Sequence, residues 1–241
     1  LPPPFDDVAV IGRFDLSNHF GLTARSAGVY TGWSPGQRAW HCDGLADTHP
    51  PPDLTLMRCI ATPTEGGDTL FACSRAAAER CTLALLPSDP DPELVRMQYQ
   101  LASSYAIESH GLSLRWARGS KGDISADVNS AHKGTEVPLV VRERVSGARA
   151  LVSTYHAHGA LVMAADHSGR VERTLAFDEA NAFLARVWAP GVSADLVYAH
   201  RWAVGDVALW SNRLVLHSAT PLDDASPSEP RIHHRIRLRS A

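Results

Sequence analysis

Runs in which apolar and polar residues alternate recur along the chain and predict strands. Five such runs are bounded by turn residues, at 54–60, 137–145, 148–153, 206–210 and 231–239. Alternation with a period of two places every second side chain on the same face of a sheet. The VSGAR segment at residues 145–149 joins two of these runs through a Ser-Gly turn. We therefore expect a β-hairpin at this position.

Two segments, 74–86 and 177–188, have apolar residues at helical spacing instead. Ser74 is a candidate N-cap for the first, and Asp178 and Glu179 lie in an early turn of the second. The strands do not alternate with helices as they do in a doubly wound sheet. The pattern predicts a mainly β fold with flanking helices, of the sandwich, barrel or jelly-roll type.

Between residues 101 and 136 the pattern gives way to polar residues and glycines, as in RGSKGDIS. A long irregular segment in a compact domain is typical of a lid or a binding loop. The chain of 241 residues contains no repeat or low-complexity linker, and its length suits one hydrophobic core. We expect a single domain over residues 1–241, with 101–136 as a lid or substrate loop.

Composition limits the class of partner. The chain has 23 basic and 26 acidic residues, so it offers no basic surface for nucleic acid or an anionic membrane. No apolar run approaches the roughly 18 to 20 residues of a membrane span, and the start LPPPFDD lacks a signal-peptide pattern. The four cysteines do not resemble a disulfide framework. We expect a cytoplasmic protein that binds a small molecule.

The segment AWHCDG contains a candidate metal-binding pair. His41 and Asp43 are two positions apart, so on a strand they point to the same side. In a chain with twelve histidines this spelling can also arise by chance. A second histidine, His217, ends the segment GDVALWSNRLVLH. Two histidines and one carboxylate match the facial triad of non-heme Fe(II) oxygenases, which leaves coordination positions open.

The last predicted strand, RIHHRIRLR, carries an unusual set of cations on one face: Arg231, His233, Arg235 and Arg237. A guanidinium that points into a core is costly unless it meets an anion, and its fork suits a carboxylate. The alternative is an exposed edge strand that is protected by charge. Earlier in the chain, Thr69 follows a Gly-Gly turn and offers a hydroxyl to a carboxylate oxygen.

These pieces, in this order, resemble the taurine dioxygenase (TauD/TfdA) family of Fe(II)- and 2-oxoglutarate-dependent dioxygenases. The ordered set is W-H-x-D, P-T-E-G-G-D-T-L-F, V-V-R before a Gly and A-L, G-D-x-x-x-W-x-N-R-x-x-x-H-x-A, and R-x-x-x-R. Each piece is common, but the ordered set is specific and covers most of residues 37–239. The resemblance implies a double-stranded β-helix (a cupin-like jelly roll) with iron at its mouth.

The resemblance also implies a role for each matching residue. His41, Asp43 and His217 would be the iron ligands. Thr69 and Arg231 would hold the distal carboxylate of 2-oxoglutarate, whose other end chelates the metal.

Two further matches concern the substrate. Arg235 corresponds to a second arginine that meets the substrate anion in sulfonate- or sulfate-using members, and Gln37 lies where the family often has a polar amide. The chain departs from the family at Ser211, where W-D-N-R is usual, and its portion before His41 is short. In relatives that portion supplies part of the substrate pocket, so the analogy does not extend to the identity of the substrate.

The implied function is oxidation, most often hydroxylation, of an unactivated C–H bond, with release of succinate and CO2. The cofactors would be Fe(II), 2-oxoglutarate and O2, and the substrate would be a small molecule, anionic if Arg235 binds it. Halogenating relatives have a small residue in place of Asp43, so chlorination is disfavoured. Relatives are often dimers or tetramers, which predicts a homo-oligomer. Two alternatives stay open: a jelly-roll metal-binding module without turnover, and a cupin-type metal enzyme that does not use 2-oxoglutarate.

Overall fold

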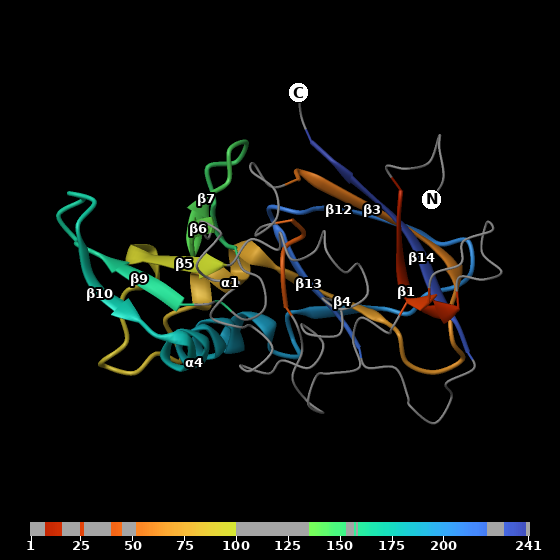
Figure 1. Cartoon of the computed structure of the whole chain (residues 1–241), viewed down its shortest axis with the longest axis horizontal. Coiled ribbons are helices and arrows are strands. Elements are labelled where there is room, and N and C mark those ends of the chain that lie inside the picture. Colours follow the sequence, from red (N-terminus) through yellow and green to blue (C-terminus); the bar gives the residue numbers. More distant parts are fainter. Residues whose placement is uncertain are drawn as a thin grey trace.

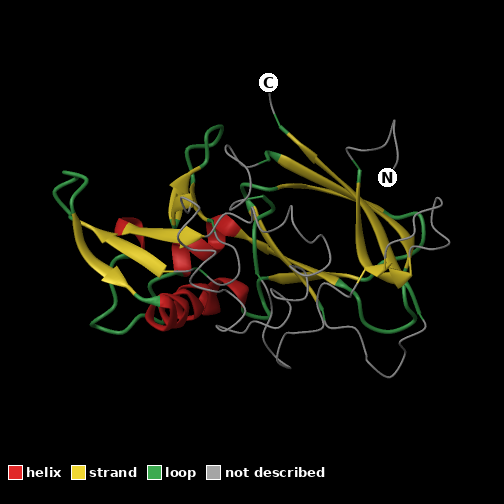
Figure 2. Ribbon diagram, viewed as in Figure 1, coloured by secondary structure: helices red, strands yellow, loops and turns green. Residues whose placement is uncertain are grey.

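Strands make up most of the regular structure (Figure 2). A computed structural model describes residues 8–15, 25–26, 40–44, 52–99, 135–152, 157, 159–220 and 229–239. Within these residues there are two α-helices, and neither is long and apolar enough to cross a bilayer. The predicted mainly β fold with flanking helices is confirmed.

Two antiparallel sheets form the half of the molecule that carries the predicted site (Figure 1). The larger sheet consists, in spatial order, of β12 (Val207–Ser211), β3 (Leu54–Ala61), β14 (Arg231–Leu238), β1 (Ala9–Asp15) and β2 (Arg25–Ser26). The smaller sheet consists of β11 (Val197–His200), β4 (Thr69–Cys73) and β13 (Val215–Ala219). Met57 and Cys59 of the larger sheet pack in one cluster with Phe71 and Val215 of the smaller sheet. The two sheets therefore face each other, as in the predicted jelly roll.

A second group of elements covers the other end of the molecule (Figure 1). It contains a four-stranded sheet, in the order β10 (Val171–Leu175), β9 (Gly159–Met163), β5 (Val95–Tyr99) and β6 (Thr135–Pro138), and a hairpin of β7 (Val140–Arg142) and β8 (Arg149–Leu151). The helices here are α1 (Ser74–Arg80), α4 (Phe177–Trp188) and the short 3-10 turns η2 (Pro92–Leu94) and η5 (Ala189–Val192). Along α4, Ala180, Phe183, Leu184 and Val187 are buried. This i, i+3, i+4, i+7 spacing forms the apolar stripe that attaches the helix to the core.

The predicted boundaries hold for most elements, with two corrections. The helix predicted over 74–86 ends at Arg80, because Leu83 and Leu86 are exposed and give the helical spacing no core to contact. The run predicted over 137–145 divides into β6 and β7. It breaks at Leu139, which is fully buried and follows Pro138, a residue without an N–H for a sheet ladder.

The hairpin is confirmed, and its turn depends on a glycine. Gly147 has a φ of +69°, and its N–H donates to the carbonyl of Glu143 over 2.8 Å. A residue with a Cβ is strained in this left-handed conformation. The predicted lid at 101–136 falls mostly outside the described residues, and its last two positions belong to β6.

Candidate functional site

Backbone pairing brings His41 and His217 side by side. The N–H of each residue donates to the carbonyl of the other over 3.0 Å, which forms an isolated antiparallel bridge. Because directly opposed residues project to the same face of a sheet, the two imidazoles lie together, with ring centroids 4.1 Å apart. Two histidines that are distant in the sequence thus point into one site on the smaller sheet.

Asp43 is held at this site from two directions. Asn212 accepts a hydrogen bond from the N–H of Asp43 over 2.7 Å and donates through its side-chain amide to the carbonyls of Asp43 (2.7 Å) and Pro52 (3.1 Å). Thr55 on β3 donates through its hydroxyl to Oδ2 of Asp43 over 3.0 Å. The backbone and the carboxylate are therefore both oriented by buried groups, as expected of partners that hold a metal ligand.

The three residues form a compact set of donor atoms. Ligand atoms of His41, Asp43 and His217 all lie within 4.8 Å of one another, and all three residues are buried. Oδ1 of Asp43 is 3.8 Å from Nε2 of His41 and 3.9 Å from Nε2 of His217.

The protonation states also suit a metal. Burial, as the largest cause, lowers the pKa of His217 to about 3, so this ring is neutral at neutral pH. Burial alone raises the pKa of Asp43, but the charges of Arg235, His217 and His41 and the Thr55 hydrogen bond together hold it well below its ordinary value. A neutral imidazole and an ionised carboxylate are the forms that bind metals. The residues present therefore fit a divalent transition metal.

Arg235 contacts the same carboxylate. Its Nη1 donates to Oδ1 of Asp43 over 2.6 Å, and its side chain is 21% exposed. Its Nε is buried and has no hydrogen-bond partner among the described residues. The family resemblance predicts that Arg235 contacts the substrate, and nothing in the sequence indicates its pairing with Asp43.

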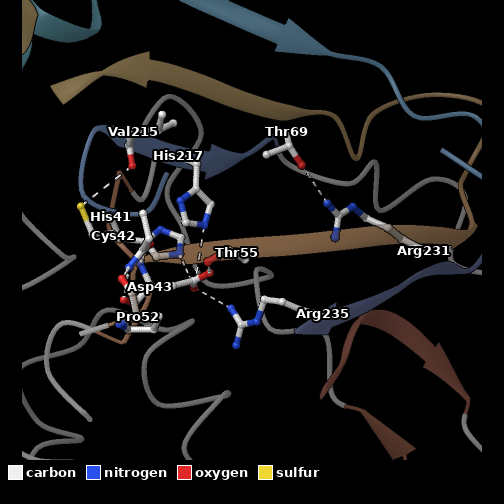
Figure 3. Close-up of polar contacts among 11 residues, drawn as sticks. His41, Cys42, Asp43, Pro52, Thr55, Thr69, Val215, His217, Arg231 and Arg235 are labelled. Atoms are coloured by element: carbon white, nitrogen blue, oxygen red, sulfur yellow. Dashed lines mark hydrogen bonds and ion pairs between the residues drawn. The ribbon is translucent and has the colours of Figure 1, made fainter. Parts of the chain in front are cut away.

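Arg231 and Thr69 meet at a second group of contacts (Figure 3). Nη2 of Arg231 donates to Oγ1 of Thr69 over 3.3 Å, and Nε of Arg231 donates to the carbonyl of Gly67 over 2.8 Å. Trp202 donates through Nε1 to the same Thr69 hydroxyl over 2.9 Å. Arg231 is only 3% exposed and β14 pairs with strands on both sides, so an exposed edge strand is excluded. Arg237, in contrast, is exposed.

Three residues that bond to predicted site residues are not among those predicted from the sequence: Thr55, Asn212 and Trp202. Asn212 lay within the W-x-N-R run, and Thr55 occupied an alternating position of a predicted strand, so both had a signal. Trp202 had none, because its bond to Thr69 joins residues 133 positions apart. Gln37 lies outside the described residues.

Comparison with known proteins places the chain in a family. The family described as "Taurine catabolism dioxygenase TauD, TfdA family" matches residues 12–237. The chain belongs to the TauD/TfdA family. This membership confirms the resemblance and explains why the His-x-Asp pair, the distant histidine and the paired arginines occur in this order.

Two curated dioxygenases are similar to this chain in sequence. The alpha-ketoglutarate-dependent 2,4-dichlorophenoxyacetate dioxygenase of Cupriavidus pinatubonensis is 30% identical over 192 residues, which are 80% of this chain and 58% of the relative. The alpha-ketoglutarate-dependent sulfate ester dioxygenase of Pseudomonas putida is 27% identical over 224 residues, which are 84% of this chain and 60% of the relative. The chain thus spans about three fifths of the length of these relatives.

Solved TauD/TfdA-type structures share the fold. The crystal structure of AAD-2 in complex with Mn(II) and N-oxalylglycine has a TM-score of 0.57 and 22% identity, covering 84% of this chain and 60% of that one. The crystal structure of a taurine dioxygenase from Burkholderia xenovorans has a TM-score of 0.57 and 19% identity, covering 99% of this chain and 66% of that one. These similarities confirm the predicted jelly-roll architecture.

Proposed function

We propose that this protein is an Fe(II)- and 2-oxoglutarate-dependent dioxygenase that oxidises a C–H bond of a small molecule and releases succinate and CO2. The observation that carries the proposal is that two arginines of one strand, β14, contact two different parts of the site. Arg235 lies at the donor set of His41, Asp43 and His217, and Arg231 lies at Thr69. A dicarboxylate that chelates a metal at one end needs a cationic clamp at the other. Neither alternative, an inert metal-binding module or a cupin enzyme without 2-oxoglutarate, requires a buried clamp.

Each residue has a defined task in this proposal. His41, Asp43 and His217 hold the metal and leave positions open for 2-oxoglutarate and O2. When bound, iron and 2-oxoglutarate supply the oxidising chemistry with O2, and the protein supplies positioning and a dry cavity. Thr55 and Asn212 orient Asp43. Arg231 and Thr69 bind the distal carboxylate of 2-oxoglutarate, and Gly67 orients the guanidinium through its carbonyl.

We assign the substrate to the class of small organic anions. The names of two relatives, a 2,4-dichlorophenoxyacetate dioxygenase and a sulfate ester dioxygenase, describe substrates that carry a carboxylate or a sulfate. Arg235 is the group we propose for the substrate anion, because its buried Nε has no hydrogen-bond partner among the described residues. Gln37 is proposed as a second polar contact. The carboxylate of Asp43 favours hydroxylation over halogenation, since it occupies the position that a halide needs.

The wider organisation is part of the same proposal. A single dioxygenase domain extends over 1–241, and residues 101–136 contribute a lid or substrate loop. All four cysteines are free, which supports a reducing cytoplasmic location. The expected assembly is a homodimer or a homotetramer, which size-exclusion chromatography with light scattering measures directly.

The deciding experiment is an anaerobic titration with Fe(II) and 2-oxoglutarate. The wild-type protein should develop the visible metal-to-ligand charge-transfer band, and admission of O2 should produce succinate. His217→Ala should develop no band, because one of its three metal ligands is gone. A wild-type protein without the band excludes the proposal. A band without succinate under any substrate tested favours the inert binding module, and a band that persists in His217→Ala excludes the ligand assignment.

A further inference from the structure

His233 is a completely buried imidazole that forms no hydrogen bond with any described residue. Its exposed fraction is 0%, and neither Nδ1 nor Nε2 has a partner within the part of the chain that the structure describes. Burial, as the largest cause, and the charge of Arg231 lower the pKa of His233 to about 3, so the ring is neutral. A neutral imidazole has one N–H donor and one acceptor nitrogen. Both are unsatisfied here, which is unusual because most buried polar groups are paired.

The backbone of β14 places this ring between the two arginines of the site. β14 pairs with β1 in an unbroken register, in which Arg231, His233 and Arg235 lie opposite Arg13, Ile11 and Ala9. The irregularity on the other side of the strand belongs to β3, where Ile232 opposes Ala61 and His233 opposes Cys59. The alternation along β14 is therefore regular. Arg231, His233 and Arg235 share the inner face of the sheet.

Trp202 connects His233 to the Thr69 end of the site. The Trp202 ring packs edge-on against His233, with centroids 4.5 Å apart and planes at 67°. The same indole donates through Nε1 to the Thr69 hydroxyl, which also accepts from Arg231. His233, Trp202, Thr69 and Arg231 thus form one contiguous group. Trp202 also packs in one hydrophobic cluster with Met57, Cys59 and Trp210.

We propose that His233 is a further 2-oxoglutarate-binding residue, which donates an imidazole N–H to the distal carboxylate held by Arg231 and Thr69. The proposal rests on the proposed function. A carboxylate offers about four acceptor positions. Arg231 and Thr69 leave some of these positions unfilled, and the bound anion would satisfy the buried donor of His233. An unpaired buried donor destabilises the ligand-free protein, and a hydrogen bond to the bound carboxylate removes this free-energy cost.

The test compares 2-oxoglutarate binding to the Mn(II)-loaded protein by isothermal titration calorimetry. His233→Met keeps the volume roughly constant and removes both unsatisfied nitrogens, so the variant should be at least as thermally stable as wild type without ligand. Its Kd for 2-oxoglutarate should rise about tenfold, as expected for loss of a hydrogen bond to a charged group. His233→Gln or His233→Asn, which restore an N–H donor, should recover most of the affinity.

His200→Met is the matched control. His200 packs on Trp202 as well, with centroids 4.4 Å apart, but both of its ring nitrogens have polar neighbours: the Tyr198 hydroxyl is 3.3 Å from Nδ1, and Oδ2 of Asp206 is 3.3 Å from Nε2. This variant should bind 2-oxoglutarate within about twofold of wild type, since it loses no donor to the ligand. An equal loss in both variants would mean that the effect passes through Trp202, and the proposal would be wrong.

Two other results would also overturn the proposal. One is a wild-type Kd in His233→Met, which would make His233 an ordinary core residue while the proposed function stands. The other is failure of the wild-type protein itself to bind 2-oxoglutarate, which would remove the proposed function as well. Nitrogen-15 spectra of histidine-labelled wild-type protein with Zn(II) give an independent readout. The His233 ring N–H, assigned by its absence in His233→Gln, should shift on addition of 2-oxoglutarate, and an unchanged signal would contradict the proposal.

Discussion

Removal of the Arg231 side chain is the sharpest perturbation of the proposed clamp. In Arg231→Ala the distal carboxylate of 2-oxoglutarate would enter a buried site without its cation. Loss of one partner from a buried hydrogen-bonded charge pair costs about 2–5 kcal/mol. At 1.4 kcal/mol per factor of ten, the Kd for 2-oxoglutarate should rise roughly 30- to 4,000-fold. The 3% exposure of Arg231 favours the upper part of this range, because solvent screens the charge weakly.

Arg231→Lys separates charge from geometry. An ammonium retains the positive charge but cannot reproduce the fork that reaches Gly67 and Thr69 together. We expect a loss of about tenfold, smaller than that of the alanine variant. Titration calorimetry on Mn(II)-loaded protein measures both, with circular dichroism to confirm folding.

Arg237→Ala is the control for Arg231→Ala, because it removes the same charge from an exposed position of the same strand. It should change the Kd by less than about twofold, since exposed charges contribute little. A wild-type Kd in Arg231→Ala, or an equal loss in Arg237→Ala, would refute the clamp.

Three further predictions concern the metal ligands, the pH dependence and the core. Asn212→Ala should lower the Mn(II) affinity about 10- to 100-fold in calorimetry. Asn181→Ala is the control, because Asn181 makes the same two hydrogen bonds to the backbone of Ala157 and lies outside the site, so this variant should leave the metal affinity unchanged. Equal metal affinities in the two variants would contradict the orienting role of Asn212. The pKa of His233 falls from 6.5 to about 3 on folding, so the unfolded state binds more protons in that window and stability decreases as the pH falls from 6.5 towards 3, by about 1.4 kcal/mol per pH unit. Urea unfolding of metal-free protein at pH 5 and pH 7 should show a shallower dependence for His233→Met, and an unchanged slope would contradict the burial of a neutral ring. Phe183→Ala, in the stripe of α4 that faces the core, should lower the free energy of unfolding by about 3–5 kcal/mol, and a loss below about 1 kcal/mol would contradict its full burial.

The local patterns predicted the elements well where burial followed the periodicity. The alternation in 54–60 matched β3, whose Thr55, Met57 and Cys59 are buried in turn. The prediction was wrong where the periodicity had no core to face, as at Leu83 and Leu86 beyond α1. Spacing shows which face of an element is apolar, but whether another element covers that face depends on the rest of the chain.

The sequence by itself determined the family, because pieces such as W-H-x-D and R-x-x-x-R occur along this chain in the order that the family resemblance requires. It also determined which residue types are available for chemistry: two histidines and a carboxylate for a metal, and a hydroxyl and a guanidinium for a carboxylate. Short-range alternation was enough to predict that Arg231, His233 and Arg235 share one face of a strand.

Only the tertiary structure decided how these groups pair. Arg235 and Asp43 are 192 residues apart, and Asn212 and Asp43 are 169 apart, yet both pairs form hydrogen bonds shorter than 3 Å. No local pattern encodes such contacts, since they arise from the register in which β14, β3 and the His41–His217 bridge align. The same alignment buries His233 against Trp202 without a hydrogen bond to any described residue, because an imidazole has partners only where the packed sheets place donors and acceptors within reach.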